Sequence, residues 1–199
     1  MASISLALVP GPDNIFVLLQ SVLHGRKAGL FVTLGLCTGL LVHTTAVCLG
    51  VAVIFQTSVL AFNILKLIGA MYLLYLAWLS FKADSSHLST KKTVDLSLRK
   101  LYYRGIFMNI TNPKVAIFFL AFLPQFTDPS KGSIVLQMLL LGALFILATI
   151  VVFGSIAYFS GYIKEWLSQS EKAQLILNRI AGTIFIALAF KLMISDNTF

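Results

Sequence analysis

The chain has 199 residues; 58% of them are hydrophobic, only 11% are Asp, Glu, Lys or Arg, and the mean hydropathy is +0.92. A soluble domain carries about 25% charged residues and could not cover so much apolar surface, so we exclude a soluble enzyme, a disordered chain and a disulfide scaffold. The formal net charge is +8, but the basic residues gather between apolar runs, which is typical of cytoplasmic loops and not of nucleic-acid binding.

Six apolar segments follow one another along the chain, and a membrane-spanning helix needs about 20 such residues. We expect spans over residues 1–23, 28–55, 59–81, 105–126, 133–159 and 180–194. The longest hydrophilic stretch, residues 82–104, is expected to be a loop, and residues 164–179 are expected to be amphipathic.

The basic residues predict the orientation of these spans. The first, third and fifth loops hold nearly all the loop lysines and arginines, whereas the second and fourth loops together hold only Lys131. Because cytoplasmic loops are enriched in Lys and Arg, we expect the odd-numbered loops in the cytoplasm and both termini outside.

Proline interrupts two of the apolar segments, at residues 10–14 (PGPDN) and at residues 112–114 (NPK). Proline removes a backbone donor, and unpaired backbone groups survive in a membrane only when they are buried in protein or line a cavity. Gly11 and Asn112 are suitable helix caps, and the proline after each suits the first position of a restarted helix. We therefore expect helices 1 and 4 to be broken there.

The two breaks divide the chain into equivalent halves. Pro12 and Pro113 each interrupt the first of three apolar segments, in halves that cover residues 1–81 and 105–194 of a single transmembrane domain, 1–199. Three spans is an odd number, so the halves are expected in opposite orientations, as in many secondary transporters. The expected fold is all-α, with six transmembrane helices arranged as two inverted three-helix repeats.

The breaks also predict a binding site. Each restarted half-helix is expected to begin near the midplane, where free N–H groups and about half a positive charge make a seat for a substrate carboxylate. Asp13 and Lys114 flank this seat, and the predicted substrate-binding residues also include those of the two breaks, Pro10, Gly11, Pro12, Asn112 and Pro113. Two interpretations stay open: a structural ion pair between the charged residues, or a site in which Asp13 meets a substrate ammonium group or carries a proton.

Other polar residues inside the apolar segments extend this prediction. Asn109, one turn before the second break, and Asn14 are expected to help bind the substrate. His43 is either a hydrogen-bonded structural residue or part of the proton coupling. Gly35 and Gly39 predict close helix packing, with a homodimer interface as a second use. The three histidines lack the spacing to carboxylates that a metal site requires, so we expect no metal and no cofactor.

Several stretches resemble the LysE/RhtB family of bacterial amino-acid exporters. They are LVPGPDN (8–14), GRKAG (25–29), LIGAMYLLYL (67–76), RGIFMNITNPK (104–114), FLPQF (122–126) and NRIAG (178–182). The resemblance implies a six-span inner-membrane exporter of amino acids or derivatives of the homoserine or threonine type, coupled to protons and dimeric. Only nine residues precede Pro10, one or two helical turns fewer than in the family pattern, so we expect a short first segment.

Three classes of function remain. The first is a secondary exporter of small zwitterions, which the broken helices and the resemblance favour. The second is a membrane-embedded enzyme, which needs a nucleophile with a base, or metal ligands, at a spacing that the sequence does not offer. The third is a channel or a non-transporting scaffold. A charged pair at two broken helices is hard to explain in a scaffold, and a channel would conduct without proton coupling.

Overall fold

The computed structural model describes residues 6–9, 11–57, 59–83, 97–163 and 171–194, and the regular structure in these ranges is all helical. Residues 6–8 are helical, and the long helices are α2 (Pro12–His24), α3 (Arg26–Thr57), α4 (Val59–Lys82), α5 (Leu98–Ile110), α7 (Ile134–Tyr158) and α9 (Glu171–Ile194). Between α5 and α7 lie α6 (Pro113–Ile117), a π-helical turn (Phe118–Phe122) and two 3-10 turns (Leu123–Phe126 and Pro129–Lys131). The predicted all-α class is confirmed.

Four described helices, α3, α4, α7 and α9, are long and apolar enough to cross a membrane, and α5 with residues 113–126 is a fifth if this bent pair is one span. The first of the six expected spans is not complete in the described residues. Its helix α2 has 13 residues, about 20 Å of helix against about 30 Å of hydrocarbon. Pro10 lies outside the described residues.

Two expected boundaries are wrong because polar stretches continue a helix. The loop expected over residues 82–104 ends early, since α5 already begins at Leu98. Leu101 is fully buried while the basic residues around it are exposed, so this stretch is an amphipathic helix that buries one face against α3. Helix α9 likewise begins at Glu171, inside the expected amphipathic segment. Residues 84–96 and 164–170 lie outside the described part of the chain.

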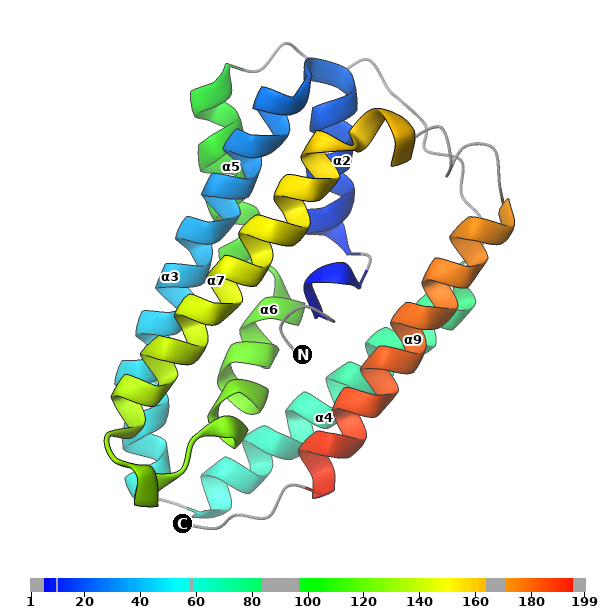
Figure 1. Cartoon of the computed structure of the whole chain (residues 1–199). Helices are drawn as coiled ribbons and strands as arrows, with labels where there is room; N and C mark the ends of the chain where they lie inside the picture. Colours follow the sequence, from blue (N-terminus) through cyan, green and yellow to red (C-terminus); the bar gives the residue numbers. More distant parts are fainter. Residues whose placement is uncertain (1–5, 10, 58, 84–96, 164–170, 195–199) are drawn as a thin grey trace.

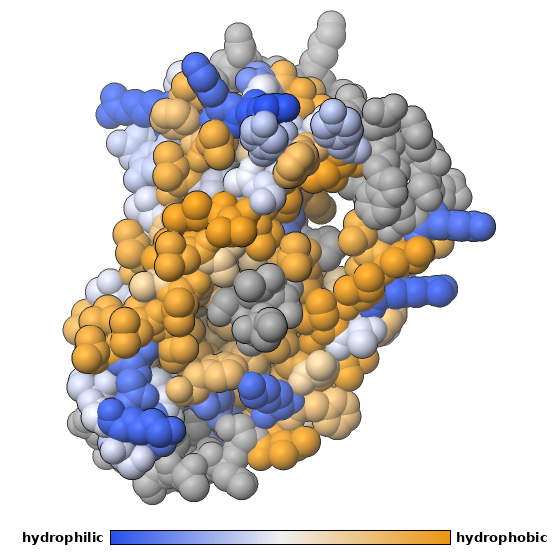
Figure 2. Space-filling model, in the orientation of Figure 1, coloured by the Kyte–Doolittle hydropathy of each residue, from blue (hydrophilic) through white to orange (hydrophobic). Residues whose placement is uncertain are grey.

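The helices form a bundle with an arm beside it. Helix α3 packs along α5 and α7, α2 packs against α3 and α7, and α4 pairs with α9 to form the arm (Figure 1). One end of the bundle holds the end of α2 and the starts of α3 and α5, whereas the end of α4 lies at the outer end of the arm (Figure 1). This end of the bundle carries Arg26, Lys27, Arg99 and Lys100, and we call it the basic end. Hydrophobic residues dominate the middle of the face shown in Figure 2.

Glycines bring α3 and α5 into close contact. A Cβ atom at Gly35 would collide with the carbonyl of Tyr102, and one at Gly39 would lie 2.6 Å from Cβ of Asn109. The close packing predicted from Gly35 and Gly39 is therefore confirmed, and it occurs within one chain. Because α5 covers this face of α3, these glycines are not free to join two copies of the chain, and the homodimer stays a prediction without an assigned interface.

The buried hydrophobic residues form two clusters with a polar layer between them. The cluster nearer the basic end includes Ala7, Phe16 and Phe153, and the other is built around Phe118 and Phe145. Residues from both clusters line the same small cavity, in which buried polar side chains of the two helix breaks also lie. The fold thus places both breaks at the boundary between the two apolar clusters.

Candidate functional site

Helix α2 begins at the first break as predicted. Gly11 is the N-cap in an extended conformation, with φ −162° and ψ 178°, and Pro12 takes the first helical turn. No side chain caps this helix start, so its first N–H groups lack the partner that most helices supply. Asp13 lies in the same turn and is only 4% exposed. This end of α2 therefore combines uncapped donors with a buried carboxylate.

Two side chains, of Lys114 and Asn14, donate hydrogen bonds to the carbonyl groups of the segment before the first break. The ammonium group of Lys114 donates to the carbonyl oxygens of Leu6 at 3.3 Å and Val9 at 3.1 Å. Asn14 Nδ2 donates to the carbonyl oxygen of Ala7 at 2.7 Å. Carbonyls at a helix end carry partial negative charge, which a buried cation stabilises. Lys114 therefore joins the second break to the first.

The second break is closed on both sides. Its two half-helices meet at an angle of 51°. Asn112 Oδ1 accepts from the backbone N–H of Lys114 at 3.0 Å, and Pro113 takes the first turn of α6, which confirms the predicted cap. At the end of α5, His43 Nε2 lies 3.1 Å from the carbonyl oxygen of Asn109. A carbonyl oxygen only accepts, so His43 carries a hydrogen on Nε2.

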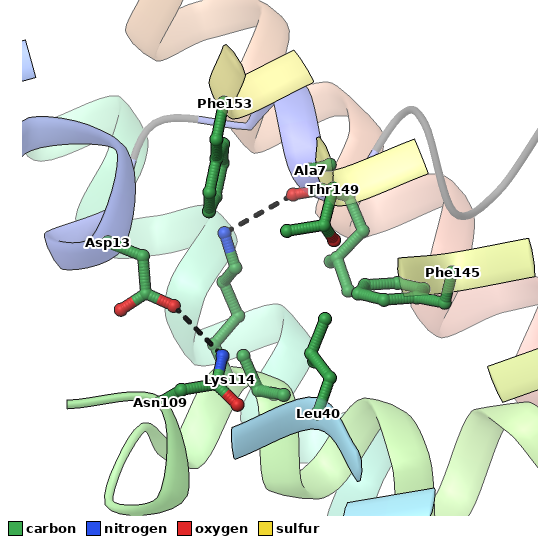
Figure 3. Close-up of a pocket in the computed structure, with 10 residues that line it drawn as sticks. Ala7, Asp13, Leu40, Asn109, Lys114, Phe145, Thr149 and Phe153 are labelled. Carbon is green, nitrogen blue, oxygen red and sulfur yellow. Dashed lines mark hydrogen bonds between the residues drawn. The ribbon is translucent and has the colours of Figure 1, made fainter. Parts of the chain in front are cut away.

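Asp13 interacts with an amide, and no salt bridge joins it to Lys114 among the described residues. Asn109 Nδ2 donates to Asp13 Oδ2 at 3.4 Å, while the Lys114 ammonium group points to the carbonyls of the N-terminal segment (Figure 3). The interpretation of these two residues as a direct ion pair is therefore wrong for this conformation. Because Lys114 donates to carbonyls of the segment before the first break, its ammonium group donates no hydrogen bond to the Asp13 carboxylate.

Several buried polar atoms of the site have no hydrogen-bond partner among the described residues. Those at the breaks are Asp13 Oδ1, Asn14 Oδ1, Asn109 Oδ1 and Asn112 Nδ2, on side chains that are 2–8% exposed. An unsatisfied buried polar group costs about 1–3 kcal/mol, so these atoms are candidates for contact with a ligand or a water molecule. The four atoms comprise three acceptors and one donor, the kinds of group that the ammonium and carboxylate ends of a zwitterion can bind.

Two hollows meet at these residues. A cavity of about 20 Å³ is lined by Asp13, Asn109 and Lys114 with apolar neighbours, which is room for about one water molecule. A separate open cleft of about 470 Å³ reaches Gly11, Asn112 and Lys114 from the side of α4 and α9. Lys114 borders both hollows. In this conformation the cavity is too small for an amino acid, so binding there requires the breaks to move apart.

The residues predicted for the site are divided between the small cavity and the open cleft. Asp13, Asn109 and Lys114 face the small cavity, whereas Pro12 and Pro113 line the cleft with Gly11 and Asn112. Asn14 and His43 act one step away, because each bonds to a backbone carbonyl at a break. Pro10 lies outside the described residues.

Helix α7 contributes residues that the sequence reasoning missed. Phe145, Thr149 and Phe153 line the small cavity opposite the breaks (Figure 3). Thr149 carries the one polar side chain between Gln137 and Ser155, which was a usable signal. It is a weak one, because threonine in a helix commonly bonds to a carbonyl of its own helix.

The chain is similar to known transport proteins. The family model for the LysE type translocator matches residues 4–196. The chain is 32% identical over 195 residues to the membrane protein YrhP of Bacillus subtilis (strain 168), covering 94% of this chain and 92% of that protein. It is 33% identical over 186 residues to a homoserine/homoserine lactone efflux protein of Salmonella typhimurium, with 94% and 89% covered.

A third relative is a leucine efflux protein of Enterobacter sp. (strain 638), which is 28% identical over 192 residues, with 94% of this chain and 89% of that protein covered. No solved structure matches the chain. The family match spans nearly the whole sequence and agrees with the broken helices and the apolar helical fold. The resemblance seen in the sequence is thus confirmed: the chain belongs to the LysE type translocator family.

Proposed function

We propose that this protein is a secondary transporter that exports amino acids or close derivatives from the bacterial cytoplasm across the inner membrane. The observation that carries the proposal is the set of buried atoms without a partner among the described residues, three acceptors and one donor, where two broken helices meet. The family supports it, as do relatives named for efflux of homoserine, homoserine lactone and leucine. The substrate is accordingly a small zwitterion or its derivative.

The proposed binding mode uses each end of the zwitterion. The α-carboxylate takes the uncapped N–H groups at the start of α2 and the free amide donor of Asn112, with Lys114 nearby as the cation. The α-ammonium group takes Asp13 Oδ1 and Asn109 Oδ1. This arrangement gives a partner to each of these atoms except Asn14 Oδ1, and charge-assisted hydrogen bonds are the stronger ones.

Alternating access follows from the two halves. We propose that they are inverted repeats, in which α3 corresponds to α7 and α4 to α9. These equivalent helices pack on each other in pairs, and the two members of each pair run in opposite directions (Figure 1), as an inverted repeat requires. The basic end faces the cytoplasm by the distribution of lysine and arginine. Rocking of one half against the other would open the small cavity to alternate sides, and it would also shift α4 relative to α9.

Proton coupling is proposed to reside on Asp13. Its carboxyl group is buried; one oxygen accepts from Asn109, and the other has no partner among the described residues. A proton on Asp13 would release the substrate ammonium group, and loss of the proton would restore the partner for it. Each charge that moves across the membrane contributes about 2.3 kcal/mol per 100 mV, which is sufficient to drive export against a gradient.

The test is export by the reconstituted protein. Vesicles that contain the full chain are preloaded with labelled amino acids, and efflux is measured with and without a proton gradient. We expect selective efflux that depends on the gradient, and loss of this dependence in Asp13→Asn. Asp128→Asn is the matched control, because it is the same substitution at an exposed 3-10 turn.

Efflux by Asp13→Asn at the wild-type rate and with wild-type gradient dependence would contradict the proposed coupling. Current without any dependence on a proton gradient would identify a channel instead. Failure of every amino acid to leave the vesicles, with the protein shown to be inserted, would contradict amino-acid export itself.

A further inference from the structure

The open cleft beside the breaks has apolar walls and a polar floor. Its floor is formed by Gly11, Asn112 and Lys114, at the two breaks. Leu76 of α4 and Phe185 of α9 contribute to its walls. The walls also include Ile15 of α2 and Tyr72 and Leu79 of α4. A ligand whose head group sits at the breaks would therefore extend its remaining atoms between apolar surfaces.

The charge of the cleft restricts what those remaining atoms are. Among its described lining residues, Lys114 is the single charged side chain, and the proposed binding mode already uses it for the α-carboxylate. A cationic substrate side chain would find no carboxylate in the described walls, and burying an unpaired charge is costly. An acidic side chain would compete with the α-carboxylate for the same lysine. Uncharged side chains meet neither difficulty.

Two contacts set the spacing of the far wall of the cleft in this conformation. Asn178 Nδ2 of α9 donates to the carbonyl oxygen of Ala83, just beyond α4, at 3.2 Å, and both residues line the cleft. A Cβ atom at Gly182 would lie 2.7 Å from the ring of Phe81, so α4 and α9 approach closely at this point. Apolar side chains of both helices therefore face a bound group together.

Resting on the function proposed above, we infer that this cleft holds the side chain of the exported substrate and selects amino acids with uncharged, aliphatic side chains. Leu76 and Phe185 are the specificity-determining contacts, because they come from the two helices of the arm. The cleft extends from the breaks to Ala83 and Asn178, beside the end of α4. The same hollow is the path by which substrate reaches the breaks from the end of α4.

The test is a competition experiment with the reconstituted wild-type protein. Efflux of labelled leucine is measured against unlabelled norvaline, alanine, homoserine, lysine and glutamate on the loading side. We expect norvaline to compete at about the leucine concentration. Lysine and glutamate should need at least about tenfold more, because one mismatched group in a fitted pocket is worth about 10-fold or more. Equal competition by leucine and lysine would overturn this inference while leaving amino-acid export intact.

Variants of α4 provide a second, independent measurement. Leu76→Ala is expected to reduce the preference for leucine over alanine about tenfold, and Leu76→Asp to improve competition by lysine by a similar factor. Leu74→Ala is the matched control, since Leu74 is 41% exposed on the same helix and does not line the cleft. Unchanged selectivity in both Leu76 variants would mean that lipid and not substrate occupies the cleft, which overturns the inference. Absence of any amino-acid efflux would overturn the proposed function as well.

Discussion

The two helix breaks begin alike and are completed differently. In each, a proline opens the restarted helix, and a donor from a distant segment closes the carbonyl end of the helix before it. That donor is Lys114 at the first break and His43 at the second. The restarted helices differ: Asn112 caps α6 with its own side chain, whereas Gly11 leaves the start of α2 without a side-chain cap.

This difference indicates that the breaks have different tasks. The second break satisfies its own helix ends and can act as a rigid joint. The first leaves donors uncapped beside the incompletely bonded carboxylate of Asp13, so it is complete only when something binds. The sequence predicted one carboxylate seat formed by both half-helix ends; in the structure Asn112 caps α6, and the start of α2 is the end without a cap from its N-cap side chain.

Replacing Lys114 should produce the largest effect, because this residue links the breaks. Lys114→Met removes the donor to two buried carbonyls and leaves Asp13 without a nearby cation. We expect export to be lost and the free energy of unfolding in detergent to fall by about 3 kcal/mol, measured by thermal or denaturant unfolding. Lys131→Met, in an exposed turn, is the control. Wild-type export by Lys114→Met would contradict the proposed link.

The charge balance at the first break can be tested by a double variant. Adding Asp13→Asn to Lys114→Met removes the unbalanced carboxylate, so part of the lost stability should return although export stays absent. If the loss of unfolding free energy in the double variant equalled the sum of the losses in the two single variants, the two charges would contribute independently.

The next largest effect on export is expected from displacing the Asn109 side chain. A methyl group at Gly39 would approach Asn109 Cβ within 2.6 Å, so Gly39→Ala should displace the amide that bonds to Asp13. We expect at least about tenfold slower export and about 1–3 kcal/mol lower stability from overpacking. Gly50→Ala lies on the same helix with nothing near its added Cβ, and should be nearly neutral. Equal rates for the two variants would show that the Asn109 position does not matter.

The fold was largely predictable from hydropathy, and the breaks from proline chemistry. Helices α3, α4 and α7 begin and end within a few residues of the predicted spans, because long apolar runs bounded by polar turns have few alternatives in a membrane. Helices α5 and α9 extend into polar stretches, where the gain comes from burying one face, such as that of Leu101, and a hydropathy average hides this.

The site was predictable in its membership and not in its bonding. Residues next to the two prolines were expected to meet, and Asp13, Asn109 and Lys114 do line one cavity. Which partner Lys114 takes depends on the relative rotation of two helices, and no sequence spacing encodes that rotation. The apolar residues of α7 in the cavity were likewise hidden, since Phe145 and Phe153 look like any core position in the sequence.

Variants of His43 test whether this residue only caps the end of α5 or also relays protons. Its Nε2 donates to the Asn109 carbonyl, which also accepts from the backbone N–H of Asn112 at 3.0 Å. Because one donor remains, His43→Leu should cost only about 1 kcal/mol of stability. His43→Gln, which can still donate, should export with normal dependence on the proton gradient. Export by His43→Gln that no longer responds to the gradient would identify this histidine as part of the proton path.

The smallest expected change separates the two roles of Asn112. Its Oδ1 caps α6, and its Nδ2 has no hydrogen-bond partner in the described part of the chain. Asn112→Ser keeps a capping oxygen but removes the amide donor, so stability should change by only a few tenths of a kcal/mol while substrate affinity falls severalfold. Asn112→Ala removes both and should cost about 1 kcal/mol more. Stability is measured by unfolding in detergent and affinity by the concentration for half-maximal efflux. If Asn112→Ser bound substrate as well as the wild type, the free amide would have no part in binding, and the second break would be a joint only. The substrate seat would then be formed by the start of α2 with Asp13, Asn109 and Lys114.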